Sequence, residues 1–257
     1  MTPDDVQTDR AHADVAVVCA LPIELAPFLA RCERVRKYVG GPFVFRGGSY
    51  DGVRVAVVES GVGFARARRA TESLILAHTP DWVLSCGFSG GLMPHTKIGD
   101  VVVGTEVSDV HGNSLEIGVK MAAQPGVHAG RLLTADSLVQ TVAEKQQLAE
   151  RWQALAVDLE SLAVAQVCSE RGTRFMAVRA ISDDLSADLP AEILSVLGNT
   201  GSMRVGAAIG AVWKRPGSFK DMWRLRETAV QTSERLADFL DGVLKQLCPQ
   251  DVSGSAD

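Results

Sequence analysis

Continuous apolar runs that alternate with segments of helical spacing constrain this chain more than any other feature. DVAVVCAL (14–21), WVLSCG (82–87) and TRFMAVRAIS (173–182) are apolar at successive positions and not at alternate ones. That pattern is typical of strands buried on both faces. Helical spacing follows Pro22 in IELAPFLARC and follows the glycines of SGVGFARARRATESLILAH. The sequence therefore predicts an α/β fold with helices on both faces of the sheet.

A hairpin signal makes the expected sheet mixed. FVFRGGSY (43–50) and VRVAVVES (53–60) flank Asp51 and Gly52, a dipeptide that favours a tight turn between antiparallel strands. The other predicted elements are a glycine turn in GFSGGL (87–92), a strand in DVVVGTEV (100–107), a helix in LAVDLESLAVAQVCSERG (155–172) and an amphipathic helix over 219–247. The apolar side of that last helix would carry Trp223, Val230, Leu236, Phe239, Leu240, Val243 and Leu247.

Composition bounds the domain count and the classes of partner. With 257 residues, 46% of them apolar, and no internal repeat, the chain predicts one domain over 14–247, with a disordered lead-in (1–13) and a disordered tail (248–257). The net charge of −5 argues against a nucleic-acid surface. The polar start does not resemble a secretory signal, and every apolar run is shorter than the roughly 20 residues of a membrane span.

The cysteines and histidines point away from metal and disulfide chemistry. The five cysteines are scattered, which suggests small buried hydrophobes in a reducing compartment, and we expect a cytoplasmic protein. The five histidines form no pair with ligand spacing, so we expect no metal site and no cofactor. His95 and His111 are expected in surface loops.

Acids and glycines gather where predicted strands end, which is where open α/β sheets bind ligands. Glu24 follows the first strand, SGVG (60–63) follows the hairpin, and Asp183 ends the strand at 173–182. Each also has a purely structural explanation. Glu24 would suit a first helical turn as a solvated acid, Asp158 a helix N-cap, and the glycines tight packing without a ligand.

The order of these motifs resembles that of a known family. ALPIE (20–24), SGVG, GFSGGL, KIGDVVV (97–103), VDLES (157–161) and RAISD (179–183) look like successive motifs of the nucleoside phosphorylase and nucleosidase superfamily. The pattern is closest to the 5'-methylthioadenosine/S-adenosylhomocysteine nucleosidases and spans residues 14 to 185. The resemblance implies a three-layer α/β/α phosphorylase fold with a mixed central sheet. It also implies hydrolysis of the N-glycosidic bond of a 5'-modified adenosine, with release of adenine.

The resemblance also implies roles for individual residues. Asp183 would be the general acid toward the purine, oriented by Ser182, and burial would have to raise its pKa for that task. Glu24 would activate water, with Arg179 as its partner, and Glu160 would bind the ribose hydroxyls. The remaining substrate-binding residues implied by the motifs are Gly63, Phe88, Ser89, Gly90 and Leu159, whose side chain would pack on the ribose. Asp158 would have a structural role.

Two departures from the nucleosidase pattern keep alternatives open. Phe88 stands where the family has a serine that helps to hold water, and Ser89 follows it. Ser85 stands where phosphorolytic relatives have an arginine, which favours hydrolysis over a phosphate-dependent phosphorylase. Arg66, Arg68 and Arg69 would supply another anion site or simply form a solvated helix face.

The segment after RAISD resembles a branch associated with hopanoid biosynthesis, which removes adenine from adenosylhopane. In that reading Val205, Ile209, Val212 and Trp213 would line a lipophilic channel, while ordinary packing explains them equally well. The resemblance further implies a homodimer and a small-molecule partner, a 5'-substituted adenosine. A non-catalytic nucleoside-binding protein is disfavoured, because a binder has no need of Glu24, Glu160 and Asp183 together.

Overall fold

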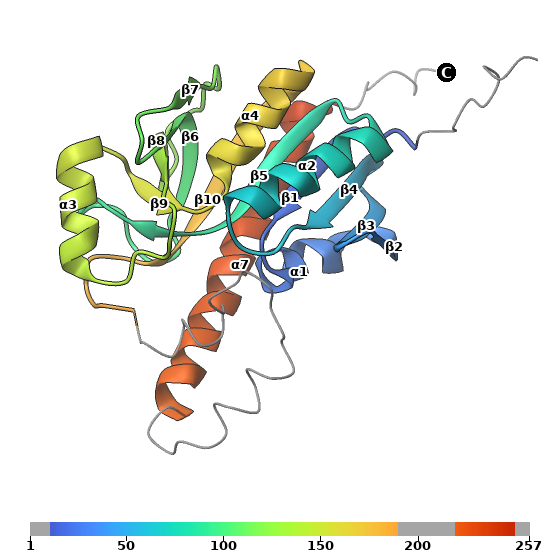
Figure 1. Ribbon diagram of the computed structural model, residues 1–257. Helices are drawn as coiled ribbons and strands as arrows, with labels where there is room; N and C mark the ends of the chain where they lie inside the picture. The colour runs from blue at the N-terminus through green and yellow to red at the C-terminus, as the bar shows by residue number, and fades with distance from the viewer. Residues whose placement is uncertain (1–10, 190–218, 250–257) are drawn as a thin grey trace, which may run out of the picture.

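A single mixed sheet organises the computed structural model, which describes residues 11–189 and 219–249 (Figure 1). In chain order its elements are β1 (Val15–Cys19), α1 (Pro22–Arg31), β2 (Glu33–Gly40), β3 (Phe43–Tyr50), β4 (Val53–Glu59), α2 (Phe64–His78), β5 (Trp82–Gly91), β6 (Val101–Asp109), β7 (Ser114–Glu116), β8 (Val127–Thr134), α3 (Val142–Trp152), β9 (Ala156–Asp158), α4 (Ser161–Arg171), β10 (Arg174–Asp183) and α7 (Phe219–Leu247).

The strands are buried on both faces, as the continuous apolar runs predict. Val15, Val17 and Cys19 of β1 pack with side chains of α1 and α7, and the intervening Ala16 and Val18 pack with α2 and α4. Successive side chains of a strand point to opposite faces, so every residue of β1 meets a helix layer. The predicted three-layer α/β/α arrangement with a mixed sheet is confirmed (Figure 1).

Part of the sheet closes on itself, which the sequence did not predict. β10 pairs with β5 in parallel and with β6 in antiparallel fashion. β8 then joins β6 to β9, and β9 returns to β5 through Gly90 and Gly91. From β5 the sheet continues as an open sheet in the order β1, β4, β3, β2, and the short β7 pairs with β6. β5 and β10 therefore lie where the ring meets the open sheet.

Two predicted boundaries are wrong. GFSGGL was expected to be a turn, but β5 continues through Gly91, because these glycines pair with β10 on one side and β9 on the other. The helix expected over 155–172 begins only at Ser161, because Ala156–Asp158 forms β9 between β5 and β8. No pattern in the sequence predicted β2, β7, β8 or α3.

The hairpin and the last helix are confirmed. Asp51 and Gly52 both have positive φ, 48° and 79°, as a two-residue turn between β3 and β4 requires. Helix α7 has the predicted bounds. Of its predicted apolar side, Leu236, Leu240 and Val243 are buried, Phe239 and Leu247 pack partly on the core, and Val230 is 45% exposed.

Some predictions lie at or beyond the edges of the described residues. Val205, Ile209, Val212 and Trp213 lie outside them, as do residues 1–10, residues 250–257 and the side chain of Trp223. Ala13, in the expected lead-in, is buried, and its N–H donates to the His78 carbonyl at 3.0 Å. All five cysteines are free, with Cys19, Cys86 and Cys168 buried, and His95 and His111 are exposed as predicted.

Candidate active site

Glu24 lies in the first turn of α1, but it is buried and not the solvated acid that its position would equally suit. Its Oε2 accepts the N–H of Leu21 at 2.7 Å, and its Oε1 accepts the N–H of Phe88 on β5 at 3.0 Å. The residue is 3% exposed. Burial raises the pKa of Glu24, against the opposing effects of the Phe88 N–H and the Arg179 charge. A carboxyl group with a raised pKa is suited to accept a proton near neutral pH.

Arg179 is a buried guanidinium at the centre of three acids. Its Nε lies 2.8 Å from Asp158 Oδ2 and donates to Ser161 Oγ at 3.1 Å. Its Nη2 donates to Ser85 Oγ at 2.8 Å, and its Nη1 lies 3.9 Å from Glu160 Oε2. The predicted partner of Arg179 was Glu24. The ion pairs go instead to Asp158 and Glu160, and Arg179 acts on Glu24 through its charge.

Asp158 and Glu160 lie two residues apart in VDLES but have different hydrogen-bond partners. Asp158 Oδ1 accepts the N–H groups of Glu160 and Ser161, both at 3.2 Å, so it binds the start of α4 from the end of β9. The N-cap residue is Glu160 and not Asp158 as predicted. Glu160 Oε1 accepts the N–H of Gly63 at 2.8 Å. Burial raises the pKa of Glu160 to about 7, with Arg179 opposing and Asp158 reinforcing the shift. We call Glu24, Asp158, Glu160 and Arg179 the carboxylate cluster.

The glycines of β5 make room for two groups of charged side chains. A Cβ on Gly87 would lie 2.6 Å from Arg179 Nη1 and 2.7 Å from Glu24 Oε1. A Cβ on Gly90 would lie 3.1 Å from Asp183 Oδ2 and 3.4 Å from Lys145 Cε. Three residues along a strand span about 10 Å, so the carboxylate cluster and Asp183 lie about that far apart along β5.

Asp183 ends β10 with a donor on each carboxylate oxygen. Ser182 Oγ donates to Oδ1 at 2.7 Å, and Lys145 Nζ of α3 donates to Oδ2 at 2.5 Å. Lys145 is fully buried, and the side chain of Asp183 is 16% exposed. Ser182 therefore orients Asp183 as expected. Lys145 was not singled out from the sequence, because a lysine in the polar segment VAEKQQLAERW gives no sign of its burial.

The other predicted substrate-binding residues surround these groups. Gly63 is the N-cap of α2 with φ of 104°, and its N–H is taken by Glu160. Phe88 is half-buried, and Ser89 is buried with its Oγ unpaired among the residues described. Leu159 packs partly against the cluster that contains Leu133 and Val157.

Three arginines of α2 were the candidate anion site. Arg68 pairs with Glu170 at 2.7 Å and with Glu72 at 3.5 Å. Arg66 Nε donates to the Ser60 carbonyl at 2.8 Å, and the exposed Arg69 donates to the Ala65 carbonyl at 3.4 Å. Arg68 thus forms one ion pair within α2 and one with α4. Arg66 is held against the turn that precedes α2.

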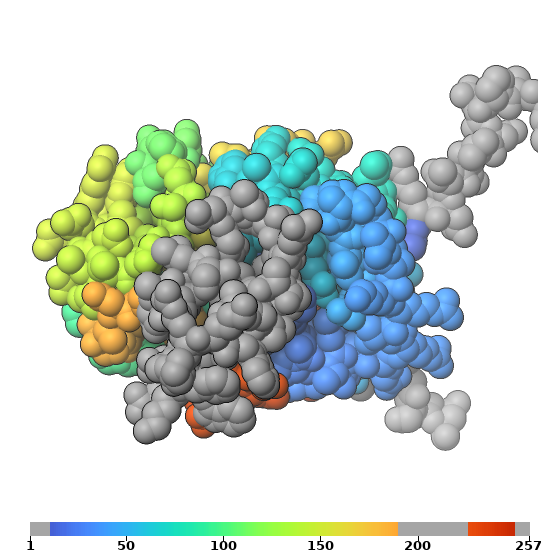
Figure 2. All heavy atoms as spheres, turned by 60° about the horizontal axis from the view of Figure 1, so that its bottom comes forward, coloured from blue at the N-terminus to red at the C-terminus, as the bar shows by residue number. Residues whose placement is uncertain are grey.

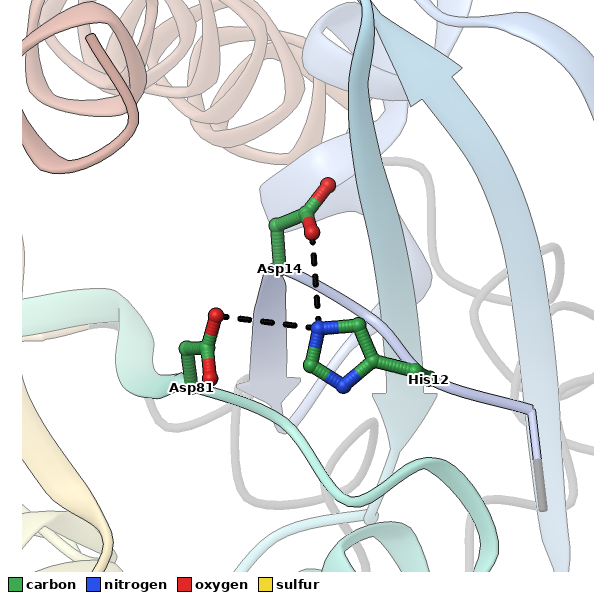
Figure 3. A group of neighbouring side chains, drawn as sticks. All are labelled: His12, Asp14 and Asp81. Atoms are coloured by element: carbon green, nitrogen blue, oxygen red, sulfur yellow. Dashed lines mark ion pairs between the residues drawn. The ribbon is translucent and has the colours of Figure 1, made fainter.

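Within the described residues, metal-ligand types gather at His12, Asp14 and Asp81 (Figure 3). His12 Nε2 lies 3.5 Å from Asp14 Oδ1 and 3.6 Å from Asp81 Oδ2. Arg54 already binds both oxygens of Asp14, so an ion would have to compete with its guanidinium. Asp14 precedes β1, so this group lies at the N-terminal end of that strand, whereas Glu24 lies beyond its C-terminal end.

In residues 11–189 and 219–249, no helix is long and apolar enough to cross a membrane.

Comparisons with known proteins identify the family of the chain. A family model described as the phosphorylase superfamily matches residues 14–125 and 117–204. A 5'-methylthioadenosine/S-adenosylhomocysteine nucleosidase of Shewanella sp. (strain W3-18-1) is 28% identical over 215 residues, covering 73% of this chain and 93% of the relative. The nucleosidase of that name from Geobacillus thermodenitrificans is 28% identical over 195 residues, covering 65% and 83%.

Solved structures share the fold. The nucleosidase of Neisseria meningitidis in complex with methylthio-immucillin-A aligns with a TM-score of 0.66 at 22% identity, covering 90% of this chain and 98% of that one. The Helicobacter pylori nucleosidase aligns with a TM-score of 0.68 at 20% identity, covering 92% and 99%. The family match extends over most of the chain, so the chain belongs to the phosphorylase superfamily.

Proposed function

We propose that this chain is a purine nucleosidase that hydrolyses the N-glycosidic bond of a 5'-modified adenosine and releases adenine. The observation that carries the proposal is the carboxylate cluster at one end of the glycine stretch of β5, with Asp183 at the other. The names of the relatives supply the substrate class, methylthioadenosine or S-adenosylhomocysteine.

Each acid has a role that its surroundings support. As the bond to the purine breaks, positive charge develops on the sugar and negative charge on the base. Glu24, with its raised pKa, takes a proton from the attacking water. Glu160 binds the ribose hydroxyls and stabilises the positive sugar, and Asp183 delivers a proton to the purine. Arg179 and Asp158 hold Glu160 in place, so they act as positioning residues.

Hydrolysis is favoured over phosphorolysis by the surroundings of Ser85. This residue stands at the arginine position of phosphorolytic relatives, and its hydroxyl accepts a hydrogen bond from Arg179. The decisive experiment measures adenine release with and without phosphate, on adenosines whose 5'-group runs from methylthio to long alkyl. Release that absolutely requires phosphate would indicate a phosphorylase. Activity confined to the long alkyl substrates would favour the adenosylhopane branch, and binding of every substrate without release a nucleoside-binding protein.

We further propose that the protein acts as a homodimer, which its family resemblance supports. Sedimentation equilibrium at micromolar concentration tests this directly. A single species at the 27.4 kDa of one chain would contradict it.

A further inference from the structure

Lys145 is a buried cation to which the proposed catalytic roles assign no function. Its Nζ donates to Asp183 Oδ2 at 2.5 Å and to the Asp184 carbonyl at 2.9 Å, and its side chain has no exposed surface. It lies in the second turn of α3, near the positive end of the helix dipole, where a cation is disfavoured. Burying an ammonium group without a partner is costly, so the fold tolerates Lys145 only because of Asp183.

The two residues are held together by the segments that carry them. Asp188 Oδ1 accepts the N–H of Val142 at 2.7 Å, and the N–H of Leu189 donates to the Gln140 carbonyl at 2.8 Å. The segment after β10 is therefore fastened to the start of α3. Figure 2 shows the segment that follows β10, in orange, against the yellow-green of α3. Contacts on both elements fix the approach of Lys145 to Asp183.

The other groups around Asp183 and Lys145 leave Lys145 as the charge partner of Asp183. Asp184 carries a carboxylate whose pKa is lowered, because hydrogen bonds from Ser186 outweigh its burial, and the exposed Lys97 acts on it by charge. Gly90 of β5 and the apolar Val157 of β9 lie beside the pair. Among the residues described, Lys145 is the cation paired with Asp183.

We propose that Lys145 is a positioning residue that stores the proton which Asp183 delivers to the leaving purine. The inference rests on the proposed function. When the bond between the sugar and the purine breaks, its electron pair goes to the purine. A proton passes from the Lys145 ammonium to the Asp183 carboxylate, and the proton of Asp183 passes to a purine nitrogen. Water adds its oxygen to the sugar and gives a proton to Glu24. Neutral Lys145 regains a proton, and Glu24 loses one, through solvent before the next turnover.

The test is the pH dependence of kcat for adenine release by the wild type and by Lys145→Met, which keeps the length of the side chain without its charge. At pH 8 we expect kcat of the variant to fall about 100-fold, the scale of general-acid catalysis, with KM changed less than about threefold. Without the lysine, Asp183 must take its proton from solution, which favours low pH. The alkaline limb of the variant's profile should therefore move to lower pH. Lys97→Met, which removes an exposed charge near the same segment, should keep the wild-type profile.

Two outcomes would overturn the inference: a Lys145→Met profile that matches the wild type, or a profile lowered equally at every pH, which is the sign of a purely structural role. Lys145→Gln repeats the measurement if the methionine variant does not fold. Lys145→Arg separates charge from proton supply, since an arginine pairs with a carboxylate but does not release its proton. We expect no recovery with arginine, and full recovery would also overturn the inference. A wild-type enzyme that releases no adenine would contradict the proposed function instead.

Discussion

Asp183 is the residue on which the proposed chemistry depends most directly. Both of its oxygens accept hydrogen bonds, from Ser182 and Lys145, so an amide can occupy the site while losing the proton-donating group. We expect Asp183→Asn to lower kcat by roughly 100-fold to 10,000-fold, with the Kd for a 5'-methylthioadenosine changed only severalfold. Steady-state kinetics and calorimetry measure the two quantities. Asp136→Asn, at an exposed carboxylate, is the control, and wild-type turnover in Asp183→Asn would refute the assignment.

At the scale of single residues, the sequence located the acids but not their pairing. Glu24 and Asp183 could be found because they follow apolar strands, and Glu160 because it interrupts an apolar segment. Arg179 has three buried acids within reach of its charge, and only the folded geometry decides that Asp158 receives the shortest contact. Lys145 could not be found, because a segment some forty residues away in the chain buries it.

Among the elements, β5 depends on its glycines in a way that one substitution can test. A Cβ on Gly87 would meet Arg179 and Glu24 closer than van der Waals contact allows, and both side chains are buried. We therefore expect Gly87→Ala to cost about 1–3 kcal/mol of unfolding free energy and to lower turnover. Gly47→Ala on β3 is the matched control, because its Cβ would meet nothing within 4 Å. Urea unfolding compares them, and equal stabilities would contradict the close approach.

The attachment of α7 to α1 supplies a second test at this scale. Arg31 at the end of α1 contacts Glu234, Asp238 and Asp241 of α7 at 2.9, 2.8 and 2.6 Å. These pairs are partly exposed, so we expect Arg31→Ala to lower the unfolding free energy by about 1–2 kcal/mol at low salt and by less in 1 M salt. Arg68→Ala should lower it by less than about 1 kcal/mol, since Arg68 has two carboxylate partners and not three, and both are more exposed than Asp241. A loss in Arg31→Ala that does not depend on salt would contradict the ionic origin.

The elements that the sequence missed share a physical cause. β9 is only three residues long and joins a ring whose other strands lie far away in the chain, so no local pattern marks it. The glycines of GFSGG have low intrinsic strand preference, and pairing with β10 and β9 overrides it. By contrast, β1, the β3–β4 hairpin and α7 were predictable, because continuous burial, an Asp-Gly turn and helical apolar spacing are local signals.

At the scale of the whole molecule, folding brings Glu24 of α1, Asp158 of β9 and Glu160, which precedes α4, around one buried arginine of β10. Three carboxylates surround one guanidinium, so the cluster carries a net negative charge when all three acids are ionised. Burial raises the pKa of Glu24, and burial together with the charges of Asp158 and Glu24 raises the pKa of Glu160 to about 7. The raised pKa values of these two glutamates thus belong to the folded state and not to the unfolded chain.

The raised pKa of Glu160 sets the sign of the pH dependence of stability. The model-compound pKa of Glu160 is 4.5 and its folded value about 7, so the native state binds more protons between these values than the unfolded state does. Its contribution to stability is fully present below pH 4.5 and is lost as pH rises through about 7. We expect Glu160→Gln to remove this contribution, so that Tm falls less between pH 5 and pH 7.5 than in the wild type. Glu116→Gln on the exposed β7 should leave the wild-type slope. Calorimetry across this range decides, and parallel Tm curves for Glu160→Gln and wild type would show that Glu160 is already ionised at pH 5 in the folded protein.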